Sequence, residues 1–278
     1  MNTVGYHIKK TILYILLVLL AVVCMIPFLL MVVNSTRTGS EIVTSFTLIP
    51  SHYLVENWKT VFAHFNLFKG MWNSVVIAVP ATLLSAYFSA LTAYGLAFYD
   101  FKGNKVIFTV ILVFMMIPGQ LSLIGFYQLC SKLHMVNTYW PLILPAIASS
   151  GTVFFLRQYI IASLPRSLIE AARIDGAHEL YSFHRIVIPV ISPAVATMSI
   201  MGFIGNWNSY LMPMLIVHKN EKMPLPVLMT TLRASVDINK NQGAIYLAVT
   251  ISVVPILLVF AGFSKYIISS VSAGAVKE

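Results

Sequence analysis

The chain has 278 residues, of which 58% are hydrophobic and only 10% are charged, and its mean hydropathy is +0.84. Soluble domains are about 25% charged, so a fold in water could not hide this much apolar surface, and the composition indicates a membrane protein. The net charge of +9 is typical of basic residues at a cytoplasmic membrane face. The sequence has no basic patch with interleaved aromatic residues, the pattern that would indicate a nucleic-acid partner.

Six apolar runs are long enough to be membrane-spanning helices, because a hydrocarbon core about 30 Å thick needs roughly 20 helical residues. Lys9 and Lys10 precede the first run, which is longer than the roughly 7–15 apolar residues of a signal peptide, so we interpret it as a retained anchor. The sequence predicts an all-α polytopic membrane protein with a single transmembrane domain over residues 1–278. The predicted spans are about 12–33, 73–98, 106–129, 139–156, 191–217 and 244–264.

The basic residues between the spans predict the orientation. With the N-terminus inside, the inner segments carry Lys9, Lys10, Lys102, Lys105, Arg157, Arg166, Arg173, Arg185, Lys265 and Lys277. The outer segments carry Arg37, Lys59, Lys69, Lys132, Lys219, Lys222, Arg233 and Lys240. Because the outer segments are longer yet hold fewer basic residues, we expect both termini and the stretch 157–190 on the cytoplasmic side.

None of the six predicted ranges contains Asp, Glu, Lys, Arg or His. This argues against an ion-driven carrier, although sodium sites built from carbonyls and hydroxyls stay open. It also argues against a membrane-embedded enzyme, and no catalytic residue or metal site is predicted. The chain has no Gly-Lys dipeptide, so it has no P-loop for a nucleotide. Any energy source must therefore be a second protein, which needs a docking surface on this one.

A polar stretch at 166–189, RSLIEAARIDGAHELYSFHRIVIP, interrupts the apolar segments. Ser167 and Glu170 match a capping box at the start of a helix. Gly176 suits the left-handed conformation that ends one. The stretch therefore predicts a first short helix that stops at Gly176.

A second helix is predicted after this glycine. It presents Leu180, Phe183 and Val187 on one side, and Pro189 limits how far it continues before the fifth span. By these signals alone, such a hairpin is more often a connector lying on the membrane.

The same stretch resembles the EAA motif of ABC importer permeases, the loop that docks into the ATPase subunit. That pattern is E-A-A, three residues, G, nine residues and I-x-L-P. Here it reads Glu170-Ala171-Ala172, Gly176 and Ile186-Val187-Ile188-Pro189, with Ile188 in place of leucine. The resemblance implies that the ATPase-coupling residues are Glu170, Ala171, Ala172, Asp175, Gly176 and Pro189.

The resemblance covers most of the chain and is closest to the second permease subunit of maltose-type carbohydrate importers. It is carried by TGSEIVTSFTLIPSHYLVENW, LTAYGLAFYDFKG, MIPGQLSLIGFYQL, NTYWPLILP, WNSYLMP and the ending AGAVKE, in this order. It implies a six-helix subunit of the bacterial cytoplasmic membrane that pairs with a sibling permease and two ATPase subunits. An extracytoplasmic binding protein would deliver the sugar. This chain would bind no cofactor and not be an enzyme, and the partner ATPase would use ATP.

Three alternatives stay open at this point. The first is an ABC permease for a non-sugar solute, such as a peptide or a polyamine. The others are a stand-alone carrier or channel and a membrane enzyme.

Polar side chains in apolar helices are candidates for lining a sugar path, because sugars are bound by amide and hydroxyl hydrogen bonds and an aromatic face. The candidates are Asn73, Gln120, Asn206, Trp207, Asn208 and Tyr210. The alternative is that the asparagines bond neighbouring helices and Trp207 packs or belongs to an interfacial belt. The resemblance to maltose-type permeases also implies that the sibling subunit holds most of the sugar contacts.

Overall fold

The computed structural model describes residues 3–64, 66–235 and 238–275, and within these ranges all regular secondary structure is helical. The chain forms two compact units: residues 1–67 with 228–254, and residues 68–227 with 255–278. Among these described residues, five helices are long and apolar enough to cross a membrane, or six if one bent pair counts as a single span. The all-α polytopic fold is thereby confirmed. The single domain over 1–278 stays a prediction.

The first unit contains α1 (Thr3–Asn34), α2 (Gly39–Thr44) and α3 (Leu54–His64), with most of α13 (Leu225–Ser235) and the start of α14 (Ile238–Ala275). Helix α1 is apolar on all sides along its span, and none of its most apolar window is buried within the chain. A helix that is hydrophobic all round belongs in lipid or against another apolar surface.

A buried arginine organises the turn after α1. Arg37 is 4% exposed and donates to the side chain of Asn34 at 3.2 Å and to the carbonyls of Glu41 and Ser45 at 2.6 and 3.1 Å. The carbonyl of Arg37 in turn accepts a bond from the Asn57 amide at 3.0 Å. A buried charge needs such partners, so this arginine knot is part of the core of the first unit.

The second unit is built around α4 (Leu67–Phe98), α5 (Asn104–Met116), α8 (Ser150–Ser163) and α11 (Ile188–Trp207). Helix α8 packs against both α5 and α11. Alanines of α4 allow the close approach of helices that small residues permit. The core cluster contains Ala90, Ala93, Tyr94, Ala97, Leu156, Ile160, Leu164, Ile169, Phe183, Val187, Ile191 and Ala194.

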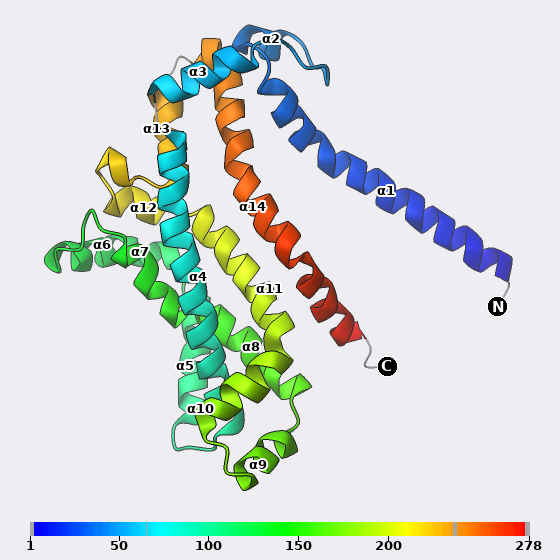
Figure 1. The fold of residues 1–278 in the computed structure, drawn as a ribbon, viewed down its shortest axis with the longest axis vertical. Coiled ribbons are helices and arrows are strands. Elements are labelled where there is room, and N and C mark those ends of the chain that lie inside the picture. Colours follow the sequence, from blue (N-terminus) through cyan, green and yellow to red (C-terminus); the bar gives the residue numbers. More distant parts are fainter. Residues whose placement is uncertain (1–2, 65, 236–237, 276–278) are drawn as a thin grey trace. The chain divides into compact units, whose positions relative to one another are not determined.

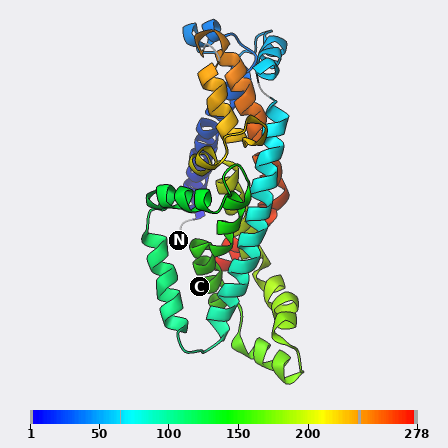
Figure 2. The same cartoon turned by 90° about the vertical axis from the view of Figure 1, so that its left-hand side faces the viewer.

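The third predicted span, 106–129, is broken rather than straight, as the sequence Pro118-Gly119-Gln120 predicts. Helix α5 ends at Met116, and the segment Gly119–Lys132, made of η1 (Gly119–Ser122) and α6 (Leu123–Lys132), is bent from it by 90° (Figure 2). Pro118 has no N–H and disfavours helical backbone at the residue before it. Ile117 is accordingly extended, with ψ at 120°.

The fifth predicted span, 191–217, begins earlier and ends earlier than expected. A continuous helix runs over Glu179–Trp207, through α10 (Glu179–Ser182), the π-helical turn η3 (Phe183–Val187) and α11. It stops at Asn208, a poor helix former, and α12 (Leu211–Ile216) follows as a separate element.

Pro189 lies inside this helix, so the expectation that it limits the second hairpin helix was wrong. The π turn provides the reason. The N–H of Ile188 bonds the carbonyl of Phe183, five residues back, and such widened turns absorb irregularities inside helices.

Each of the other spans extends beyond its predicted range at one end or at both. Helices α1, α4 and α14 are longer than 12–33, 73–98 and 244–264. The fourth consists of α7 (Trp140–Ile143), η2 (Leu144–Ala148) and α8, which extends beyond the predicted end at 156. The short turn η4 (Asn220–Lys222) precedes α13.

The longer helices change one conclusion about charge. Arg157 lies inside α8, and Glu179, His184 and Arg185 lie in the helix that becomes α11. The absence of ionisable residues holds for the predicted ranges but not for the observed helices, because apolar composition marks the hydrocarbon core while a helix continues past it.

Candidate functional site

The polar stretch forms a hairpin of α9 (Arg166–Ile174) and α10 at one end of α4 and α11 (Figure 1). Gly176 has φ at +79°, which confirms the predicted left-handed helix end. The N–H of Gly176 bonds the carbonyl of Arg173 at 3.0 Å, and the N–H of Ala177 bonds that of Ala172 at 2.9 Å. These two bonds satisfy the last carbonyls of α9 and turn the chain into α10.

The predicted capping box at Ser167 does not form. Helix α9 begins at Arg166, and its N-cap is Pro165, with an extended backbone and no side-chain hydrogen bond. Ser167 is therefore already inside the first turn, where its hydroxyl cannot serve as the cap.

One side of the hairpin is buried in the core of the second unit. Ile169 and Ala172 of α9 are buried, and Phe183 and Val187 of the π turn are fully buried. Leu180 was predicted on the same side but is 55% exposed, which corrects that prediction. Leu180 lies in the first turn of the second helix, before the π turn, and the core that buries Phe183 and Val187 does not reach it.

The opposite side of the hairpin is open to its surroundings. Of the six predicted coupling residues only Ala172 is buried, while Glu170, Ala171, Asp175, Gly176 and Pro189 are exposed. Within the described residues, the carboxylates of Glu170 and Asp175 make no hydrogen bond and no ion pair. The hairpin therefore exposes two carboxylates that have no partner within the described residues, beside small side chains.

A network around Glu179 connects α9, α10 and the end of α4. Arg173 Nε donates to Glu179 Oε1 at 2.7 Å, and the Tyr94 hydroxyl donates to Glu179 Oε2 at 3.0 Å. The Arg173 guanidinium also lies 5.1 Å from the centre of the Tyr99 ring. Hydrogen bonds to Glu179 and Tyr99 raise the pKa of Arg173 above its ordinary value, so it stays a cation.

Sequence reasoning missed these four residues. Glu179 stands in the first turn of the second helix, where an acidic residue is common. Nothing in a single sequence pairs it with Tyr94, 85 positions away.

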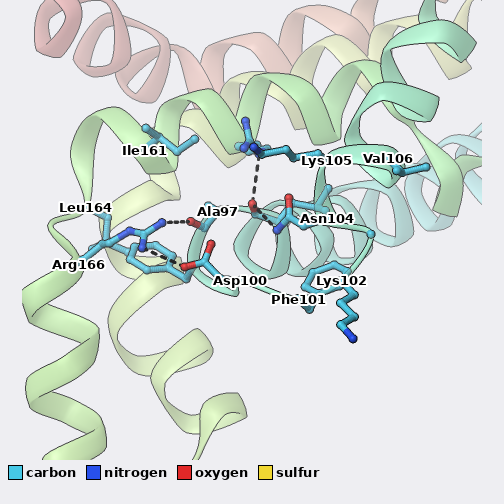
Figure 3. A pocket seen from close by; sticks show the side chains of 14 residues that line it. Ala97, Asp100, Phe101, Lys102, Asn104, Lys105, Val106, Ile161, Leu164 and Arg166 are labelled. Carbon is cyan, nitrogen blue, oxygen red and sulfur yellow. Dashed lines mark hydrogen bonds and ion pairs between the residues drawn. The ribbon is translucent and has the colours of Figure 1, made fainter.

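The carbonyl end of α4 is bonded by side chains from three other segments. Arg157 Nε and Asn104 Nδ2 both donate to the Leu96 carbonyl at 3.3 Å, and Arg166 donates to the Ala97 carbonyl at 3.5 Å (Figure 3). Cations are favourable at this end of a helix. Arg166 thereby ties the first residue of α9 to α4.

The predicted sugar-path residues do not form one cluster. Asn73 is buried and donates to the carbonyls of Glu221 and Met223 at 2.9 and 3.0 Å, so its amide holds α4 to the η4 turn. Gln120 is exposed in η1, at the break after α5.

The Asn206–Tyr210 stretch is divided between core and surface. Asn206 lines a cavity of about 310 Å³ between the α6, α7 and α12 regions. Trp207 is 2% exposed and stacks on Phe203 with ring centres 5.6 Å apart. Asn208 is exposed and Tyr210 half-buried. The role of these residues in a sugar path stays a prediction.

Sequence reasoning also missed Asn137, which has φ at +61°, a conformation that asparagine tolerates better than most residues. Its side-chain oxygen accepts the N–H groups of His218 and Lys219 at 2.7 and 3.1 Å. Its carbonyl accepts Lys222 Nζ at 3.0 Å. With Asn73, it anchors the segment between α12 and α13.

The comparisons with known proteins all point to permease components of transport systems. The family described as binding-protein-dependent transport system inner membrane component matches residues 85–273. The arabinooligosaccharides transport system permease protein AraQ of Halalkalibacterium halodurans is 35% identical over 93% of both chains. That of Bacillus subtilis is 32% identical over 98% of this chain and 96% of the relative. The diacetylchitobiose uptake system permease protein NgcG of Streptomyces coelicolor is 33% identical over 93% of this chain and 86% of the relative.

A solved structure resembles the chain in fold. It belongs to a bacterial ABC transporter involved in the import of the acidic polysaccharide alginate, and its TM-score is 0.81 over 96% of this chain and 99% of that chain. The sequence identity is 20%, so this similarity concerns the fold.

Proposed function

Because the chain belongs to the family of binding-protein-dependent transport system inner membrane components, we propose that it is the permease subunit of an ABC importer for a sugar or oligosaccharide. The observation that carries this proposal is the near end-to-end match, at 32–35% identity, to permeases named for arabino-oligosaccharides and diacetylchitobiose. A permease for a non-sugar solute is the alternative.

The proposed assembly is a heterodimer with a sibling permease, two ATPase subunits that bind the ATP, and an extracytoplasmic sugar-binding protein. It lies in the bacterial cytoplasmic membrane with both termini inside, and the chain itself is not an enzyme. The uncovered apolar surface of α1 supports contact with the bilayer or the sibling.

The hairpin is proposed to dock into an ATPase subunit and to pass its movement on. Its exposed side carries Glu170 and Asp175, and its buried side is fixed by Phe183 and the Glu179 network. Since one helix runs over Glu179–Trp207, displacing the hairpin also tilts α11. Such rocking is how alternating access exposes a path to each side in turn.

In the proposed sugar path, the amides of Asn206 and Asn208 are the available hydrogen-bonding groups. The Trp207 ring is closed off by Phe203, so a sugar stacks on it only in a state where these rings separate.

Docking is tested by charge reversal at Glu170. We expect Glu170→Lys to leave insertion and thermal stability unchanged, because the carboxylate is exposed and unpaired, while less ATPase copurifies and uptake falls. Glu56→Lys is the matched control, since Glu56 is also an exposed acidic residue of a short helix, α3, outside the hairpin. Equal copurification of ATPase with both variants would contradict docking at this hairpin.

The solute class is tested by uptake in a strain in which only this gene is deleted. We expect restored uptake of a labelled arabino-oligosaccharide or of diacetylchitobiose when the gene is returned, and no change in uptake of a peptide or a polyamine. Restored uptake of the peptide or polyamine alone would replace the sugar by a non-sugar solute.

A further inference from the structure

A cavity of about 640 Å³ lies where α4 ends, next to the start of α5 and the end of α8 (Figure 3). Four basic side chains and one carboxylate line it: Lys102, Lys105, Arg157, Arg166 and Asp100. The cavity therefore has an excess of positive charge.

Two of the four basic side chains are not used within the described residues. Lys102 and Lys105 are exposed and make no hydrogen bond or ion pair within the described residues. Arg166 pairs with Asp100 at 3.6 Å, with side chains 62% and 89% exposed, and such surface pairs are weak.

Contacts on two sides hold Arg157 in the cavity. It is half-buried, its Nε is bonded to the Leu96 carbonyl, and its guanidinium lies 4.0 Å from the centre of the Phe108 ring. These contacts hold the plane of the guanidinium and leave its two terminal nitrogens for an anion. A planar fork held in this way suits a phosphate group.

The cavity also has an apolar side that continues along the outside of α5. Val106 lines the cavity, and Val110 and Val113 follow at the i+4 and i+7 positions of the same helix face. All three are exposed. A basic cavity with such an apolar extension fits a ligand with a phosphate at one end and acyl chains at the other.

We infer that this cavity binds the phosphate of an anionic phospholipid, whose acyl chains lie along the Val106–Val113 face of α5. Basic pockets between membrane helices are known to hold anionic headgroups. An acidic segment of the ATPase would match the charge but not the apolar face, and a free phosphate would not use that face. The inference goes beyond the proposed function and does not depend on the transported solute.

The test uses the full-length chain in phosphatidylcholine vesicles that contain a phosphatidylglycerol with a photoreactive acyl chain. We expect cross-links on α5. We expect the double variant Lys102→Gln/Lys105→Gln to reduce them about fivefold for each charge removed. Both lysines are exposed, so the variant should keep its thermal stability. Lys9→Gln/Lys10→Gln, an exposed pair outside the cavity, removes the same charge and should leave the cross-links unchanged.

Three results would overturn the inference. Equal losses in both double variants would indicate general attraction of anionic lipid. Loss of the cross-links on adding glycerol phosphate would indicate a site for a soluble phosphate. Loss on adding the purified ATPase subunits would assign the cavity to that protein.

Discussion

The arginine knot of the first unit and the hairpin of the second unit contain the same local pattern, a hydroxyl residue followed three positions later by glutamate. In the knot, Thr38 and Glu41 form a full capping box, with bonds of 3.2 and 3.0 Å. The bond from the Thr38 backbone lowers the pKa of Glu41. In the hairpin, Ser167 and Glu170 form no such pair. The Thr38–Glu41 pair is bonded internally, whereas the Glu170 carboxylate of the hairpin is exposed and makes no hydrogen bond or ion pair within the described residues.

The largest loss of stability is expected at Gly243, which packs directly against Arg37 and Asn57. A Cβ added at Gly243 would lie 1.9 Å from the Arg37 carbonyl oxygen and 2.6 Å from the Asn57 amide nitrogen. We expect Gly243→Ala to lower the free energy of unfolding by about 1–3 kcal/mol or more, as in overpacked cores. Thermal unfolding in detergent measures it. Gly262→Ala in the same helix is the control, because nothing lies within 4 Å of that added Cβ, and equal losses would refute the clash.

The next effect concerns the turn of the hairpin. At φ of +79°, Gly176→Val introduces left-handed strain of roughly 1–2 kcal/mol. We expect assembled transporter to fall, or ATP hydrolysis to continue without uptake. Gly176→Asn should retain more uptake, because asparagine tolerates this conformation. Wild-type uptake in both variants would mean that the hairpin is only a connector.

The two capping patterns are compared directly by removing each hydroxyl. Thr38→Ala should destabilise the protein by about 1 kcal/mol, the usual loss for a helix cap. Ser167→Ala should have little effect, because Ser167 caps nothing. Chemical denaturation of the two variants side by side measures the difference. A larger loss for Ser167→Ala would reverse the comparison.

The smallest effect is expected in the Glu179 network. Tyr94→Phe and Glu179→Gln each weaken the same 3.0 Å bond, at about 0.5–1.5 kcal/mol. Because the residues are partners, their effects on stability and on uptake should not add in the double variant. Tyr139→Phe removes a separate hydroxyl bond, 3.1 Å to the Lys222 carbonyl, so it is the control and should add to either change. Additive effects of Tyr94→Phe and Glu179→Gln would show that the bond does not form.

Much of the fold follows from the sequence alone. The apolar runs identified the membrane helices, because a bilayer requires long apolar segments whatever their partners. Gly176 predicted the end of α9, because few other residues accept the left-handed backbone conformation found there. The spacing of Glu170, Gly176 and Pro189 pointed to the family that the comparisons establish.

Partners distant in the sequence could not be predicted. Tyr94 with Glu179, Asn73 with the η4 turn and Asn137 with His218 are each joined only by folding. The position of Trp207 in the core, stacked on Phe203, likewise depends on packing that composition does not reveal.

Two prolines show most clearly that local chemistry alone does not decide whether a helix ends. Pro118 and Pro189 lack the same N–H and carry the same ring, yet Pro118 separates α5 from α6 while Pro189 lies inside a continuous helix. The sequence by itself determined that both sites would be irregular. Only the tertiary structure decided the form. Phe183 and Val187 are fully buried against α4 and α8, and this packing holds a widened turn in place before Pro189, so the helix continues.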